Sequence, residues 1–155
     1  MQRLERILKE KKLLLIIDEV QTGVYRSGNF LISQYFGIKP DIVTLAKGLA
    51  SGIPIGVMMT SLKDIFTFGD HGSTFGGNHL STTVCKAVLK ILEKYSNSGK
   101  LSENIKYFNS CLQYFTDKYP NIFLQKNGWG FMQGLVLKNE NDLSNIVNLA
   151  LKMVF

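Results

Sequence analysis

Apolar residues in the first part of the chain follow two patterns, short continuous runs and positions repeated at helical spacing. Leu4, Ile7 and Leu8 show the helical spacing and predict a helix near the start. Short runs that are apolar on both faces are typical of strands in a parallel sheet covered by helices. This part is expected to contain strands over 13–17, 42–45 and 55–59, a turn-rich loop over 23–29, and helices over 30–36 and 80–95.

The second part begins after the polar break over 96–99 and has a different order of elements. Apolar positions from Leu101 to Phe115 recur at helical spacing and predict a long helix. Two short strands are expected to follow, and a final helix is expected near the carboxyl end. The strands are predicted over 122–124 and 131–137, with Gly128 and Gly130 between them, and the helix over 143–154. The pattern therefore divides the chain into residues 1–97 and 98–155.

Composition and charge exclude several kinds of partner. The net charge of +6 comes from basic residues spread along the 155-residue chain, so it does not indicate a nucleic-acid surface. No apolar run approaches the length of a membrane span, and the charged segment 1–12 lacks the apolar core of a signal peptide. We therefore expect a cytoplasmic protein without a membrane partner.

Cysteine and histidine give no signal of a metal site. Cys85 and Cys111 both lie in apolar helical stretches and are expected to be small buried hydrophobic residues, as suits a reducing compartment. Asp70, His71 and His79 fall in one loop without helical spacing or a cysteine pair, so we expect no metal ion there.

Candidate chemistry follows the ends of two predicted strands. Asp18 directly follows the run 13–17, and Lys47 follows the run 42–45 after one residue. Because the carboxyl ends of parallel strands meet at one edge of a sheet, these two side chains should lie close together. A carboxylate can pair with a protonated pyridine nitrogen, and a lysine amine can react with an aldehyde. The pair suggests a pyridoxal 5'-phosphate site.

Asp18 and Glu19 could instead be the magnesium-binding carboxylates of a nucleoside triphosphatase. This segment alone does not decide between such an enzyme and a pyridoxal phosphate site. An ATPase requires a phosphate loop of the form GxxxxGK[ST], which is absent from the chain, and Lys47 is followed by Gly48. The glycine-rich segment 72–78 offers a weaker phosphate signal, because Thr74 has a hydroxyl and a backbone N–H and glycines let a backbone approach a phosphate.

Several of these segments together resemble the class III (subgroup III) aminotransferases, and most closely the acetylornithine and ornithine branch. The resemblance rests on the segments 17–23, 40–41, 45–48, 52–56 and 71–78. It implies an α/β chain of fold type I, the fold of many pyridoxal-phosphate-dependent transferases. Residues 1–97 would then be part of the large cofactor domain, with a mostly parallel sheet, and residues 98–155 part of the small carboxyl-terminal α+β domain.

The resemblance also implies roles for single residues. Asp18 would bind the pyridine nitrogen, Val20 would pack on the ring, and Gln21 would contact the ring hydroxyl. Lys47 would hold the cofactor and, with Asp18, carry the catalysis. Thr74 would reach the phosphate of the partner's cofactor across a homodimer interface, and Ser73 would lie near the substrate.

In this family the expected reaction is transamination between an ω-amino donor, of acetylornithine or ornithine type, and 2-oxoglutarate, as in arginine biosynthesis. The matched segments correspond only to the middle and later part of a class III enzyme, so the reaction is expected of a complete parent protein. An alternative is a noncatalytic fragment from a truncated or split reading frame, which should expose apolar surface. Tyr25 departs from the family, where a small residue, usually glycine, precedes Arg26.

Overall fold

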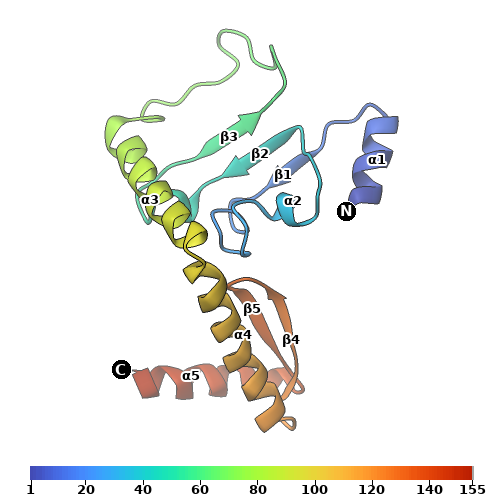
Figure 1. The fold of residues 1–155 in the computed structure, drawn as a ribbon, viewed down its shortest axis with the longest axis vertical. Helices are drawn as coiled ribbons and strands as arrows, with labels where there is room; N and C mark the ends of the chain where they lie inside the picture. Colours follow the sequence, from blue (N-terminus) through green and yellow to red (C-terminus); the bar gives the residue numbers. More distant parts are fainter. Residues whose placement is uncertain (155) are drawn as a thin grey trace. The chain divides into compact units, whose positions relative to one another are not determined.

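The computed structural model describes residues 1–154 and divides into two compact units (Figure 1). The first unit comprises Met1–Ser102, and the second begins at Glu103. The first contains a small mixed sheet with helices, and the second contains a hairpin with helices.

A three-stranded sheet forms the centre of the first unit. Its central strand pairs in parallel with one neighbour and antiparallel with the other, so the sheet is mixed. The register places Asp18, the last residue of its strand, opposite Thr44. The strands, in spatial order, are β1 (Ile16–Asp18), β2 (Ile42–Leu45) and β3 (Val57–Thr60).

The first strand begins later than the apolar run predicts. Leu13 donates its N–H to the carbonyl of Leu8 and is thereby tied back to the last turn of the preceding helix. Leu15 donates its N–H to the carboxylate of Asp41 at 2.8 Å, and only from Ile16 onward does the chain run in the ladder with β2. Leu13 and Leu14 are exposed, so the continuous apolar run does not correspond to a strand buried on both faces.

Helices in the first unit lie close to the predicted positions. The long helix predicted over 80–95 runs from His79 to Asn97, because the side chain of Asn78 accepts the N–H of Ser81 and caps its start. One short helix follows the loop after β1, and a 3₁₀ helix begins just beyond the end of β2. The helices are α1 (Gln2–Glu10), α2 (Ile32–Tyr35), the 3₁₀ helix η1 (Lys47–Ala50) and α3 (His79–Asn97).

The core of this unit lies on one face of β2. Val43 and Leu45 point to that face and pack with Leu49, while Cys85 and Leu89 of α3 cover the cluster. Ile42 and Thr44 alternate onto the opposite face, as the two-residue period of a strand requires. Thr44 is therefore on the side of the sheet away from the buried cluster.

A hairpin packs within the second unit. The predicted helices are confirmed as α4 (Lys100–Lys118), most of which lies in this unit, and α5 (Leu143–Val154). The first strand is longer than expected and passes through Gly128, whose φ of +127° suits only glycine. The remaining elements are β4 (Phe123–Trp129), β5 (Met132–Leu137), antiparallel to β4, and the 3₁₀ helix η2 (Glu140–Asp142).

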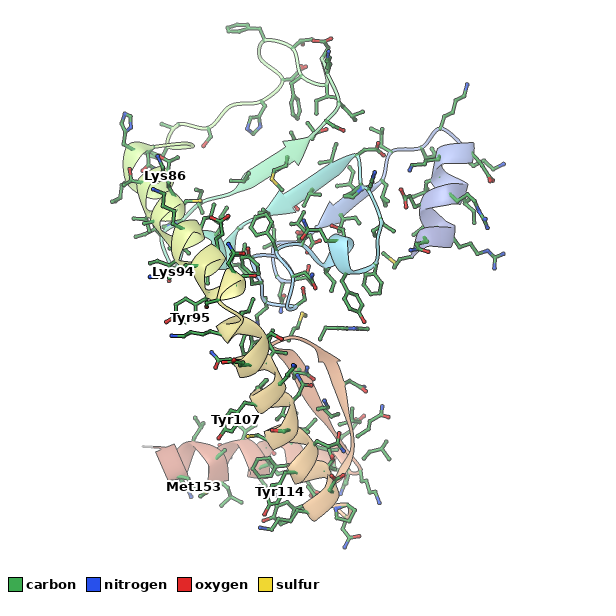
Figure 2. All side chains as sticks on the ribbon, in the orientation of Figure 1. Lys86, Lys94, Tyr95, Tyr107, Tyr114 and Met153 are labelled. Carbon is green, nitrogen blue, oxygen red and sulfur yellow. The ribbon has the colours of Figure 1, made fainter. Side chains whose placement is uncertain are left out.

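Many large apolar side chains of the described residues are exposed. Met153 of α5 is 88% exposed and Tyr107 of α4 is 73% exposed (Figure 2). Along the approach to β1, Leu13, Leu14 and Ile16 are all more than half exposed. The two cysteines are free thiols and only partly buried. Within residues 1–154, every helix is too short or too polar to cross a membrane.

Candidate functional site

Asp18 ends β1 with an exposed and well-oriented carboxylate. Its Oδ1 accepts the backbone N–H of Val20 at 2.9 Å and the hydroxyl of Thr44 at 2.9 Å. These two hydrogen bonds, in that order, lower the pKa of Asp18, and the positive charge of Lys47 lowers it further. Hydrogen bonds to a carboxylate favour its ionised form. Asp18 is therefore a negative charge at the carboxyl end of the first strand.

Lys47 stands at the start of η1, directly beyond β2. Its Nζ donates a hydrogen bond to Oε1 of Gln21 at 3.3 Å. Its backbone φ is +47°, in the left-handed region that residues with a side chain seldom adopt. Such a conformation costs about 1 kcal/mol or more and is common where a side chain is aimed at a ligand. The structure thus places an exposed amine beside an exposed amide and near the Asp18 carboxylate.

Val20 links these groups along the main chain. It lies between Asp18 and Gln21, it is partly buried, and its N–H is the donor to Asp18. The structure therefore brings Asp18, Val20, Gln21 and Lys47 together at the carboxyl ends of β1 and β2, the edge at which sheets of this kind bind ligands.

Ser73 and Thr74 lie elsewhere, in the exposed loop between β3 and α3. Among residues 1–154, no hydrogen bond or ion pair joins either of them to Asp18, Gln21 or Lys47. Gly76 is required there, because a Cβ at this position would lie 2.7 Å from Cβ of Ser73. Asn78 then holds the end of the loop by donating to the carbonyl of Phe75 at 3.0 Å.

Two residues to which sequence reasoning assigned no role in a cofactor site, Glu19 and Thr44, support it. Glu19 is completely buried, and its carboxylate organises the loop that follows Asp18. Thr44 supplies one of the two donors to Asp18. The two-residue period of a strand could have indicated both residues. Glu19 follows Asp18 and therefore faces the opposite side, and Thr44 is the polar residue in an apolar strand.

Tyr25 shows a consequence of its departure from glycine. Its φ is +65° and that of the preceding Val24 is +54°, so both adopt the left-handed conformation in which glycine is not penalised. The ring of Tyr25 lies 5.6 Å from the ring of Phe30, centroid to centroid, which offers a compensating aromatic contact. The loop after Gln21 therefore keeps a backbone suited to glycine.

The donor set at this edge fits a cofactor that carries an aldehyde and a basic ring nitrogen. A lysine amine, an ionised carboxylate and an amide are presented together, and all three side chains are exposed. Asp18 suits a cationic nitrogen because its depressed pKa keeps it ionised. Lys47 is the amine within this cluster.

Comparison with known proteins agrees with this chemistry. The family model of the class III aminotransferases matches residues 1–153. The acetylornithine aminotransferase of Wolinella succinogenes is 48% identical over 151 residues, which cover 97% of this chain and 38% of that protein. The chain thus spans little more than a third of the length of this curated relative.

Solved structures show the same similarity in three dimensions. The acetylornithine aminotransferase of Elizabethkingia anophelis has a TM-score of 0.80 at 28% identity, over 96% of this chain and 39% of that one. An ornithine aminotransferase of Toxoplasma gondii, with PLP at partial occupancy in its active site, has a TM-score of 0.76 at 29% identity, over 88% and 33% of the two chains. The fold is the α/β fold type I, and this chain belongs to the class III aminotransferases.

Proposed function

We propose that this chain contributes the lysine and ring-binding part of a pyridoxal 5'-phosphate site in a complete aminotransferase. The observation that carries the proposal is the meeting of Lys47, Gln21 and the Asp18 carboxylate at one sheet edge. The complete protein would transfer an amino group from an ω-amino donor, of acetylornithine or ornithine type, to 2-oxoglutarate. The names of the similar proteins support this substrate class.

When bound, pyridoxal phosphate supplies an electron sink for the electron pair left as a proton leaves the substrate Cα. Asp18 would keep the pyridine nitrogen protonated through its own negative charge, which its two hydrogen bonds and Lys47 stabilise. Lys47 would hold the cofactor through Nζ and would move the proton at the substrate Cα. Val20 would pack on the ring, and Gln21 would contact the ring hydroxyl.

Ser73 and Thr74 would act in an assembled homodimer. Thr74 would reach the phosphate of the cofactor bound by the partner chain, and Ser73 would lie near the substrate. Both residues are exposed, and within residues 1–154 no hydrogen bond or ion pair joins them to the Lys47 cluster (Asp18, Val20, Gln21 and Lys47). A role toward another chain agrees with this placement. The close approach of Gly76 to Ser73 gives the loop a defined turn at this point.

We further propose that residues 1–97 form part of the cofactor domain and residues 98–155 part of the small domain. The two compact units support such a division, although their boundary falls at Ser102. We propose cytoplasmic arginine biosynthesis as the setting of the complete protein, because this chain is similar to acetylornithine aminotransferases.

A second candidate is a noncatalytic fragment that associates with a complementary piece. The exposure of Leu13, Leu14 and Ile16 favours it, because β1 pairs on one side only and its apolar approach is uncovered. On this reading the residues of the Lys47 cluster reflect ancestry, and the chain alone would not select one lysine for reaction with the cofactor.

Borohydride trapping decides between the two candidates. The purified chain would be mixed with pyridoxal phosphate, reduced, and digested, and the modified lysine would be found by peptide mass. Modification concentrated on Lys47, lost in Lys47→Arg and kept in the matched surface variant Lys63→Arg, supports a formed site. Modification spread over the exposed lysines in all three proteins would contradict the proposed function and support the fragment.

A further inference from the structure

We propose that Thr44 is a positioning residue whose hydroxyl orients the Asp18 carboxylate toward a cationic ring nitrogen. The inference deepens the proposed function and rests on it. Thr44 would not touch the reacting atoms, and it would act through Asp18.

The strand register brings these two side chains together. Asp18 and Thr44 are Cα partners in the parallel pair of β1 and β2, and Glu19 continues the ladder by donating its N–H to the carbonyl of Thr44 at 2.9 Å. The hydroxyl of Thr44 donates to Oδ1 of Asp18 at 2.9 Å across this pair. The donor is therefore fixed by the sheet, and its position does not depend on a loop.

Both donors to Asp18 bind the same oxygen. The N–H of Val20 and the hydroxyl of Thr44 each lie 2.9 Å from Oδ1, and no hydrogen bond within residues 1–154 engages Oδ2. Two donors from different directions fix the plane of a carboxylate more firmly than one. Oδ2 is consequently the oxygen left available to a ligand.

Thr44 is suited to this task by its side chain and its face. A β-branched side chain in a strand has few χ1 rotamers, so its hydroxyl needs little reordering to donate. The residue lies on the face opposite the buried Val43 and Leu45, and thus does not contribute to the core cluster. Within residues 1–154, the hydroxyl of Thr44 donates its hydrogen bond to Asp18 alone.

A purely structural role for Thr44 makes a different prediction. A threonine can favour a strand through its shape, and Thr44→Val keeps that shape while it removes the hydroxyl. Thr44→Ser keeps the hydroxyl and loses the methyl group. If shape alone matters, serine should be the more damaging change, whereas a positioning role makes valine the damaging one.

The first measurement follows the ionisation of Asp18 without any cofactor. Carboxyl carbon NMR of the full chain would give its pKa in the wild type, Thr44→Val and Thr44→Ser. The charged group acting on Asp18 is Lys47 of η1, which all three proteins keep. Loss of the hydroxyl should raise the pKa of Asp18 in Thr44→Val, and Thr44→Ser should restore it. An identical pKa in wild type and Thr44→Val would overturn the proposal.

The second measurement tests the link to the cofactor. The dissociation constant of pyridoxal phosphate should rise about three- to tenfold in Thr44→Val, as for the loss of one hydrogen bond of ordinary strength, and stay near wild type in Thr44→Ser. Thermal melting would verify that Thr44→Val is folded. If wild type binds pyridoxal phosphate, the proposed function is upheld. If a folded Thr44→Val then binds it with the same affinity as wild type, the positioning role of Thr44 is refuted. No binding by wild type would instead reject the proposed function of the chain, and with it this role of Thr44.

Discussion

Glu19 and Ser33, fourteen residues apart, are joined by a buried hydrogen bond of 2.9 Å from the backbone N–H of Ser33 to Oε1. The other oxygen of Glu19 accepts the N–H of Ile32 at 2.9 Å and the hydroxyl of Thr22 at 2.8 Å. One fully buried carboxylate therefore ties the start of α2 to the loop that carries Val20 and Gln21. These hydrogen bonds therefore fix the main chain at Asp18 and Val20, the two sequence neighbours of Glu19.

We expect Glu19→Gln to destabilise the first unit by about 2 kcal/mol, because an amide replaces one acceptor with a donor that faces other donors. Amide hydrogen exchange at Ile32 and Ser33, together with urea unfolding followed by circular dichroism, measures the effect. The matched control is Gln34→Ala, which removes only an exposed acceptor for Leu31 and should change stability by about 0.5 kcal/mol or less. Unchanged protection in Glu19→Gln would contradict the buried clamp.

Gly23 allows the loop to lie directly on the core. An added Cβ would lie 2.6 Å from Cδ2 of Leu45 and 2.8 Å from the carbonyl oxygen of Glu19. Because the second contact is backbone, Gly23→Ala should cost about 2 kcal/mol. Chemical denaturation compares it with Gly56→Ala, where a Cβ meets nothing within 4 Å. Equal stability of the two variants would show that the loop can move away.

Asp18 should make stability depend on acid pH. Its pKa is lowered in the folded chain from an ordinary value of 3.8, so the folded state favours the ionised form. This contribution is fully present above that ordinary value and is lost as the pH falls through the lower folded pKa. The difference in unfolding free energy between wild type and Asp18→Asn, measured at several pH values, should therefore shrink below about pH 4. A difference that is constant down to pH 2 would argue against the two hydrogen bonds.

Asn78 both caps α3 and holds the Thr74 loop. Its Oδ1 accepts the N–H of Ser81 at 2.9 Å, and its Nδ2 donates to the carbonyl of Phe75 at 3.0 Å. Asn78→Ala should lose about 1 kcal/mol through the cap. Asn78→Asp keeps the cap acceptor and removes the donor, so it should preserve slow exchange at the Ser81 amide while the loop becomes easier to cleave with a protease. Equal cleavage of wild type and Asn78→Asp would show that the hydrogen bond from Asn78 to Phe75 does not hold the loop.

Gly128 permits the hairpin of the second unit. Its φ is +127°, and an added Cβ would clash with the carbonyl oxygen of Met132. Gly128→Ala should therefore cost about 3 kcal/mol and change the fluorescence of the neighbouring Trp129. Gly134→Ala on the opposite strand, where a Cβ meets nothing within 4 Å, serves as the control. Similar melting of both variants would show that the hairpin register is adaptable.

The amino-acid sequence was sufficient for the order of the α-helices and strands and for placing Asp18 and Lys47 at one edge of the sheet. Local periodicity determines helices such as α3 and α5, and the proximity of Asp18 and Lys47 follows because each lies at or just beyond the end of a recognisable apolar segment. The start of β1 and the path of β4 through Gly128 were less predictable, since both depend on which backbone groups another segment engages.

Tertiary structure alone decided how the site residues are supported. Thr44 meets Asp18 only through the register of β1 on β2, and Glu19 finds its two backbone donors only when α2 folds back over the loop. Such contacts join residues 13 to 26 positions apart, and no local pattern encodes their distance. Composition and periodicity determine which residues can take part in the chemistry. The geometry that holds a carboxylate in one orientation arises from long-range hydrogen bonds, which form only in the folded chain.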